Sequence, residues 1–228
     1  MSCLQENLAA VQAAVRAAET AAGRSENTVK LLVVSKTMPL ALLRELYELG
    51  IREFGENREP ELEQKAAAMP ADVIWHFIGP VQSNKIRKVV KQAAVIHSVD
   101  SVEKLLKFDR IAGEENKTPE VFLEVNVSGE LSKGGMTPAQ VIDAVKTAVD
   151  CRFVKCRGLM TMAPLAAGHE ELLQIFGTLR DLRDRAEAEC GCALPQLSMG
   201  MSGDFPEAIA CGATIVRVGS KIFAGVSK

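Results

Sequence analysis

Short apolar runs alternate with longer amphipathic stretches along most of the chain. The runs are rich in valine, isoleucine, leucine and phenylalanine and have few polar interruptions, which is typical of strands buried on both faces of a parallel sheet. The predicted strands are Val29–Ser35, Arg52–Gly55, Val73–Ile78, Ala94–Ser98, Val121–Val127, Gly158–Met162, Gln196–Met199 and Thr214–Val218.

Segments with helical periodicity separate these strands. The predicted helices are Leu40–Leu49, Glu59–Ala68, Ser83–Gln92 with Ser83 as its N-cap, Ser101–Glu115, Pro138–Ala148, Glu170–Glu189 and Phe205–Cys211. A further helix over residues 4–22, ended by Gly23, precedes the first strand. Eight strands with intervening helices predict an α/β fold, and this number favours a closed (β/α)8 barrel of the TIM type with an extra N-terminal helix. No G-x-G-x-x-G motif follows the first strand, which counts against a dinucleotide-binding sheet.

Length and composition agree with a single barrel domain over residues 1–228, because such a barrel needs about 200 to 250 residues. The 27 basic and 29 acidic residues give a net charge of −2, so we expect no general affinity for nucleic acid or anionic membranes. No signal peptide and no apolar run of about 20 residues are apparent, which predicts a cytoplasmic protein. The six cysteines lack the spacing of a metal site and are interpreted as structural thiols.

Active-site residues of such barrels lie at the carboxyl ends of the strands. Lys36 follows the first strand, where partial desolvation would favour a neutral, nucleophilic amine that can form an imine with an aldehyde. The alternative is a surface lysine whose charge stays in solvent. Asn57 follows the second strand and can contact a ligand or serve a turn. His76 alternates with apolar neighbours and is interpreted as a hydrogen-bonded core residue.

The loops after the last two strands carry small residues at the positions that barrels commonly use for phosphate. Residues 197–204 contain two glycines and two serines, and Gly219 and Ser220 follow the eighth strand. Backbone N–H groups can approach phosphate oxygens there, although tight turns alone would also need glycine. Arg217 lies within the eighth strand, so its buried guanidinium needs a partner: an ion pair, or a ring nitrogen of a phosphorylated ligand. Together with Lys36, these groups describe a site for pyridoxal 5′-phosphate (PLP).

Six segments are similar, in order, to the PLP homeostasis protein family, also called the YggS or PROSC family. They are VVSKTMP around Lys36, FGEN at 54–57, HFIGPVQSNK at 76–85, GLMTMAP at 158–164, LSMGMSGD at 197–204 and VRVGSKIFAG at 216–225. The resemblance implies a barrel like the N-terminal domain of alanine racemase.

The same resemblance assigns roles to individual residues. It implies that Lys36 forms a Schiff base with PLP and that Arg217 faces the pyridine nitrogen. It places Ser198, Ser202, Gly219 and Ser220 around the phosphate, and Asn57 near the ring. Residues 58–61 (REPE) depart from the family pattern, which affects only contacts from the start of the following helix. Lys133 matches a family lysine whose role is open.

The function implied by the resemblance is a PLP carrier or buffer in intracellular PLP homeostasis, without catalytic residues. An arginine opposite the ring nitrogen keeps the ring neutral and weakens it as an electron sink. We also expect no second domain that could supply an opposing base, and a monomer. PLP-dependent apo-enzymes are candidate recipients.

Three alternatives remain open from the sequence. The first is a PLP-dependent amino-acid racemase built on the same barrel. The second is a PLP-free barrel enzyme that acts on a sugar phosphate. The third is an interaction protein whose bound PLP reports vitamin status to a partner.

Overall fold

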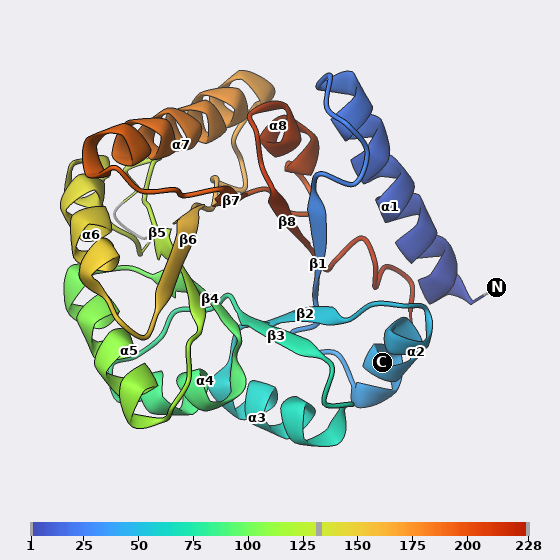
Figure 1. The fold of residues 1–228 in the computed structure, drawn as a ribbon. Coiled ribbons are helices and arrows are strands. Elements are labelled where there is room, and N and C mark those ends of the chain that lie inside the picture. Colours follow the sequence, from blue (N-terminus) through green and yellow to red (C-terminus); the bar gives the residue numbers. More distant parts are fainter. Residues whose placement is uncertain (1, 131–133, 227–228) are drawn as a thin grey trace.

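Eight parallel strands form a closed barrel in the order β1 to β8 (Figure 1). The structure is a computed structural model that describes residues 2–130 and 134–226. The strands are β1 (Lys30–Val34), β2 (Glu53–Glu56), β3 (Ile74–Phe77), β4 (Val95–Val99), β5 (Glu120–Glu124), β6 (Lys155–Met160), β7 (Gln196–Ser198) and β8 (Ile215–Val218). Each strand pairs with the next one in the sequence, and β8 closes the barrel on β1. The prediction of a (β/α)8 barrel is therefore confirmed.

The helices form a ring around the barrel (Figure 1). They are α1 (Cys3–Ala21), α2 (Leu40–Glu48), α3 (Glu59–Ala68), α4 (Ile86–Gln92), α5 (Val102–Glu114), α6 (Pro138–Asp150), α7 (His169–Cys190) and α8 (Phe205–Ala210). The extra helix α1 lies between α8 and α2, and its apolar residues at positions 4, 8, 11 and 15 are buried. The predicted N-terminal helix thus completes the outer layer beside β1.

The start of α4 differs from the prediction. The helix begins at Ile86 instead of Ser83, and its N-cap residue is Lys85, whose side chain makes no capping bond. The residues before it form a turn in which Lys85 N–H donates to the Gln82 carbonyl at 2.8 Å. The predicted N-cap role of Ser83 is therefore wrong, because the turn occupies residues 82–85 and the helix begins only after it.

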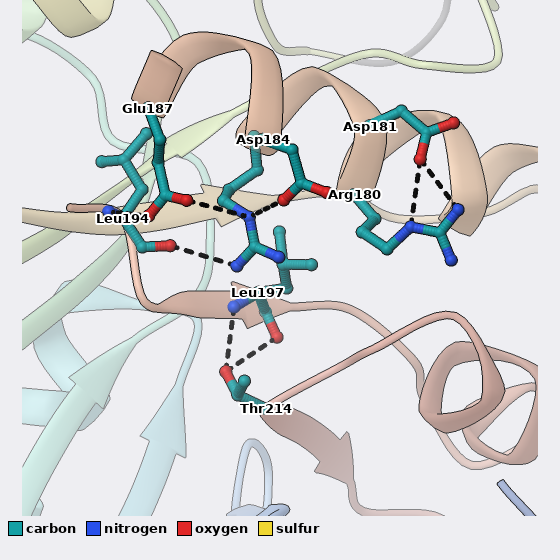
Figure 2. A network of polar contacts seen from close by, with 8 residues as sticks. Arg180, Asp181, Asp184, Glu187, Leu194, Leu197 and Thr214 are labelled. Atoms are coloured by element: carbon teal, nitrogen blue, oxygen red, sulfur yellow. Dashed lines mark hydrogen bonds and ion pairs between the residues drawn. The ribbon is translucent and has the colours of Figure 1, made fainter. Parts of the chain in front are cut away.

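Polar contacts join α7 to the segment before β7, and β7 to the residue before β8 (Figure 2). The Arg183 side chain lies 2.5 Å from Asp184 Oδ1 and also donates to the Leu194 carbonyl at 3.3 Å. Leu197 N–H donates to Thr214 Oγ1 at 2.9 Å, which ties β7 to the start of β8. These bonds fix the two strands whose ends carry the predicted phosphate loops.

The barrel interior differs from the apolar layer between barrel and helices. One small apolar cluster lies inside, formed by Leu32, Val95, Phe122, Met160 and Ile215. The interior also holds a set of buried polar side chains, namely His76, His97, Ser198 and Arg217. Within the described ranges, no helix has both the length and the apolar character that crossing a membrane requires.

Candidate functional site

A cavity of about 460 Å³ opens at the carboxyl end of the barrel. Six of the seven residues predicted from the sequence line it: Lys36, Asn57, Ser202, Arg217, Gly219 and Ser220. They come from the ends of β1, β2 and β8 and from the loop after β7. The barrel therefore brings together side chains that are up to 184 positions apart in the sequence, from 36 to 220.

Lys36 lies in the turn directly after β1 with an exposed side chain. The turn carries the side chain out of the strand into the mouth of the cavity, which Lys36 lines, so the expected partial desolvation of its amine stays a prediction. The backbone around it is firmly held from below: Ser35 Oγ donates to Glu56 Oε1 at 2.6 Å, and Lys65 Nζ donates to the Ser35 carbonyl at 2.8 Å. The Lys36 side chain thus extends from a backbone that is held by hydrogen bonds.

Thr37, next to this lysine, has φ = 63°, a conformation that β-branched residues rarely adopt. Its N–H donates to Glu61 Oε2 on α3 at 3.2 Å. Glu61 belongs to the segment that departs from the family pattern. The start of α3 therefore stabilises the Lys36 turn, in addition to any contact with a ligand.

Arg217 is 4% exposed and lies between the interior and the cavity. Its Nη1 donates to Ser198 Oγ at 2.7 Å and its Nη2 donates to the Thr161 carbonyl at 2.9 Å. Burial lowers the pKa of Arg217 to about 10, although Asp204 and Glu124 oppose this effect. With a pKa of about 10 the guanidinium stays protonated at neutral pH, and its two hydrogen-bond acceptors, Ser198 Oγ and the Thr161 carbonyl, carry no charge that would compensate it.

Ser198 is the one predicted residue that the structure does not bring to the cavity. Its side chain is fully buried and bonded to Arg217 and, at 2.8 Å, to His97 Nδ1. The short strand β7 directs this side chain into the barrel, beneath the guanidinium. Ser198 therefore contacts Arg217 and does not line the cavity in which the phosphate contact was expected.

The loops after β7 and β8 leave room only for glycine at two positions. A Cβ on Gly219 would lie 2.8 Å from the Val34 carbonyl oxygen, and a Cβ on Gly200, where φ is 91°, would lie 2.7 Å from Ala208 Cβ. The Asp204 side chain accepts a hydrogen bond from Met201 N–H and closes the turn that carries Ser202. Together these contacts shape a small, rigid cradle opposite Lys36.

Asn57 is half-buried, and its Oδ1 has no hydrogen-bond partner within the described structure. It borders the main cavity and a neighbouring one of about 500 Å³. A Cβ on Gly79 would lie 2.2 Å from the Asn57 carbonyl oxygen, so the β3 loop presses directly on its backbone. An unpaired amide oxygen in a rigid position is suited to a ligand that donates a hydrogen bond.

Several functional positions were not anticipated from the sequence. Met162, Leu165 and Met201 supply the apolar wall of the cavity, and the rule that selects strand ends could have found Met162. His97 lies in an apolar strand, where only its neighbours in space reveal a role. His76 is 1% exposed and bonded to His97 and Glu53, as expected for a core histidine. Lys133 lies outside the described residues.

Metal and disulfide sites do not contribute to this geometry. All six cysteines are free thiols. In residues 2–130 and 134–226, no group of three or more His, Cys, Asp or Glu side chains is placed to hold a metal ion.

Comparisons with known proteins agree with the fold and show the family. The family model for the N-terminal domain of alanine racemase matches residues 7–226. The pyridoxal phosphate homeostasis protein of Aquifex aeolicus strain VF5 is 41% identical over 219 residues, which are 96% of each chain. The structure of PipY from Synechococcus elongatus PCC7942 with PLP bound is 36% identical, with a TM-score of 0.85 over 97% of this chain and 100% of that chain.

A more distant similarity concerns the fold alone. An alanine racemase of Clostridium difficile 630 is 14% identical, with a TM-score of 0.73 over 99% of this chain and 60% of the racemase. The chain also covers 96% of the pyridoxal phosphate homeostasis protein of Pseudomonas aeruginosa PAO1, to which it is 40% identical. The chain belongs to the pyridoxal phosphate homeostasis protein family, within the broader family of alanine racemase N-terminal domains.

Proposed function

We propose that this protein binds PLP covalently and reversibly through Lys36 and serves as a PLP carrier or buffer rather than as an enzyme. The observation that carries the proposal is that Lys36, Arg217 and Gly219 meet in one cavity of about 460 Å³. When bound, PLP would supply an aldehyde, which condenses with a primary amine to a carbon–nitrogen double bond and releases water. PipY, a relative in the same family, is known with PLP bound.

The residues present fit this cofactor. Gly219, where a Cβ would meet the Val34 carbonyl at 2.8 Å, together with Ser202 and Ser220, forms a cradle suited to the phosphate. Arg217 is a fixed donor for the ring nitrogen, and the unpaired Oδ1 of Asn57 is an acceptor for a polar substituent of the ring. These contacts complement a planar ring that bears an aldehyde and a phosphate.

The residues that line the cavity are poorly suited to amino-acid racemisation. A racemase needs a second base on the face of the substrate opposite the lysine. Besides Lys36, the titratable residues in the described lining are Asp204 and Arg217. Asp204 is buried and engaged by Met201 N–H, and Arg217 only donates. Neither is suited to remove a proton from an amino acid, which supports a handover role toward PLP-dependent apo-enzymes.

The test is reduction of the PLP-loaded protein with borohydride, followed by peptide mapping. We expect the label on Lys36, and we expect Lys36→Ala to lose the near-visible absorption of the linked cofactor. Lys221→Ala is a matched control, because Lys221 is an exposed lysine beside Ser220. A label on another lysine, or no label, would contradict the proposal.

The rival enzymatic function has its own test. Incubation of the loaded protein with L-alanine, L-serine or L-glutamate would show racemisation at enzyme-like rates if the racemase alternative holds. We expect none at such rates. A protein that ignores added PLP and instead binds sugar phosphates would favour the PLP-free alternative.

A further inference from the structure

A continuous line of hydrogen bonds crosses the interior of the barrel. Arg217 Nη1 donates to Ser198 Oγ at 2.7 Å, and Ser198 Oγ lies 2.8 Å from His97 Nδ1. His97 Nε2 lies 2.9 Å from His76 Nδ1, and His76 Nε2 lies 2.8 Å from Glu53 Oε2. The line runs from the cavity to Glu53, the first residue of β2, at the opposite end of the barrel.

Only one direction of donation satisfies every member of this line. A guanidinium can only donate, so Ser198 Oγ accepts from Arg217. If Ser198 Oγ also accepted from His97 Nδ1, the Ser198 hydroxyl hydrogen would have no acceptor in this line and His76 would have to be charged, so we assign the Ser198 hydrogen to His97 Nδ1. His97 then donates from Nε2 to His76 Nδ1, and His76 donates from Nε2 to the Glu53 carboxylate. Both histidines are consequently neutral and carry their hydrogen on Nε2.

The surroundings of the histidines favour this arrangement. Burial lowers the pKa of His76, although Glu53 opposes the effect, and burial together with the positive charges of Arg217 and Lys30 holds the pKa of His97 well below its usual range. His97 also stacks on Phe122, with ring centroids 4.5 Å apart and 11° between the planes. Two neutral imidazoles in fixed orientations are therefore the stable state.

The outer end of the line is an ionised carboxylate. Burial alone would raise the pKa of Glu53, but hydrogen bonds from His76 and Lys30 outweigh it and lower the pKa to about 2. Lys30 Nζ lies 2.8 Å from the same carboxylate oxygen. The charge of Glu53 thus keeps a hydrogen on His76 Nε2, which leaves His76 Nδ1 as the acceptor for His97. In the same way His97 Nδ1 becomes the acceptor for Ser198.

We propose that Glu53, His76, His97 and Ser198 are positioning residues that orient Arg217 toward the ring nitrogen of bound PLP. Nη1 is held by this line and Nη2 by the Thr161 carbonyl, so the guanidinium plane is fixed at both ends. A guanidinium has five N–H donors, so donors remain for an acceptor in the cavity. The inference rests on the proposed function for its ligand, but the order of the line is a property of the protein alone.

The cost of these groups supports a role beyond packing. His97 and Ser198 are both 0% exposed, and buried polar groups stabilise a core only if every member is bonded. Apolar side chains at this level of the barrel would fill the same space and would need no hydrogen-bond partners. The interior instead holds one line that ends on the arginine of the cavity.

The first test uses the ligand-free protein. The chain has three histidines, so ¹⁵N-histidine labelling and long-range ¹H–¹⁵N spectra resolve each ring, with His169→Gln identifying the surface one. We expect His76 and His97 to be neutral with hydrogen on Nε2. Hydrogen on Nδ1 of either ring would overturn the proposed order, whether or not the protein binds PLP.

The second test reads the ring nitrogen of bound PLP. In protein loaded with ¹⁵N-labelled PLP, we expect Ser198→Ala and the remote Glu53→Ala to shift the ring-nitrogen resonance and to weaken PLP retention by about 3- to 10-fold, the range for one lost hydrogen bond. Glu53→Gln can still accept from His76 and should restore most of the effect. Asp72→Asn removes a surface carboxylate that pairs with Arg52, and it should change nothing.

The two tests separate the failure of this inference from failure of the proposed function. Unchanged ring-nitrogen resonances in folded Ser198→Ala and Glu53→Ala protein would overturn the positioning role while leaving PLP binding intact. Absence of a borohydride-trapped adduct on Lys36 would overturn the proposed function, while the histidine spectra of the ligand-free protein still decide the order of the line.

Discussion

Nζ of Lys65 lies 2.7 Å from Oε1 of Glu56, and both side chains are almost completely buried, at 9% and 0% exposure. Glu56 ends β2 and Lys65 lies on α3, so this ion pair joins the barrel to its outer layer. The same ammonium donates to the Ser35 carbonyl, one residue before Lys36. The pair therefore supports the base of the predicted PLP-binding lysine.

Removal of Lys65 is expected to be costly. Lys65→Met leaves the Glu56 carboxylate buried without its cation, which should lower the free energy of unfolding by about 3–5 kcal/mol. The double variant Lys65→Met with Glu56→Gln removes both charges and should recover part of the loss. Urea denaturation measures both values. Lys146→Met, which removes an exposed lysine 3.7 Å from Asp143, is the control and should change the stability by less than about 1 kcal/mol. An equally small effect of Lys65→Met would contradict the structural role.

Gly219 is expected to tolerate no side chain. The Cβ of Gly219→Ala would lie 2.8 Å from the carbonyl oxygen and 3.2 Å from the Cβ of Val34, the last residue of β1. The resulting shift should lower stability by about 1–3 kcal/mol and weaken PLP binding, because it displaces the cradle from the strand that carries Lys36. Gly203→Ala is the matched control: Gly203 lines the same cavity, but a Cβ there has no heavy atom within 4 Å. Thermal unfolding and PLP titration measure both changes, and equal behaviour of the two variants would refute the close contact.

Arg217→Ala is expected to weaken PLP retention while the barrel still folds. The change removes the donor for the ring nitrogen and leaves the Thr161 carbonyl without the 2.9 Å hydrogen bond, at a cost of about 1–3 kcal/mol. It also removes a buried charge whose two bonded acceptors are neutral, which offsets part of that cost. Absorbance after dialysis gives the PLP occupancy, and circular dichroism checks the fold. Equal occupancy in variant and parent would count against the assigned role of Arg217.

The fold and the position of Lys36 at the cavity could be predicted because both depend on local pattern. Alternating apolar and amphipathic segments predict the eight strands, and the strand-end rule then selects Lys36. The exposure of Lys36 was beyond this reasoning, since the φ of 63° at Thr37 and its bond to Glu61 belong to the folded turn.

Side-chain direction inside the barrel was also beyond the sequence pattern. The loop after β7 looks like a phosphate cradle, and the sequence cannot show that Ser198 turns inward to meet Arg217 at 2.7 Å. In the sequence, His97 is a polar residue within an apolar run, and nothing in this pattern indicates its partners. Its partner Ser198 is 101 positions away, and only the closure of the barrel brings the two together.

Glu124, at the end of β5, is expected to make stability depend on pH. It is 6% exposed, and burial, assisted by Asp100, raises its pKa to about 7 against the opposing charges of Arg217 and Lys104. The folded state therefore holds the proton more tightly than the unfolded state, whose carboxyl has a pKa near 4.5. This contribution to stability is complete below pH 4.5 and is lost as the pH rises to about 7.

Glu124→Gln keeps the shape of the protonated acid and cannot ionise. The variant should match the parent near pH 4.5 and exceed it in free energy of unfolding above pH 7, by at most about 3.5 kcal/mol, since the pKa of Glu124 rises from 4.5 to about 7 and each pKa unit corresponds to about 1.4 kcal/mol. Urea denaturation at several pH values measures the difference. Glu103→Gln, on the exposed surface of α5, controls for the loss of one negative charge. If the difference in free energy of unfolding between Glu124→Gln and the parent stayed constant from pH 4.5 to 8, the pKa of Glu124 would be the same in the folded and unfolded states. That result would contradict the prediction.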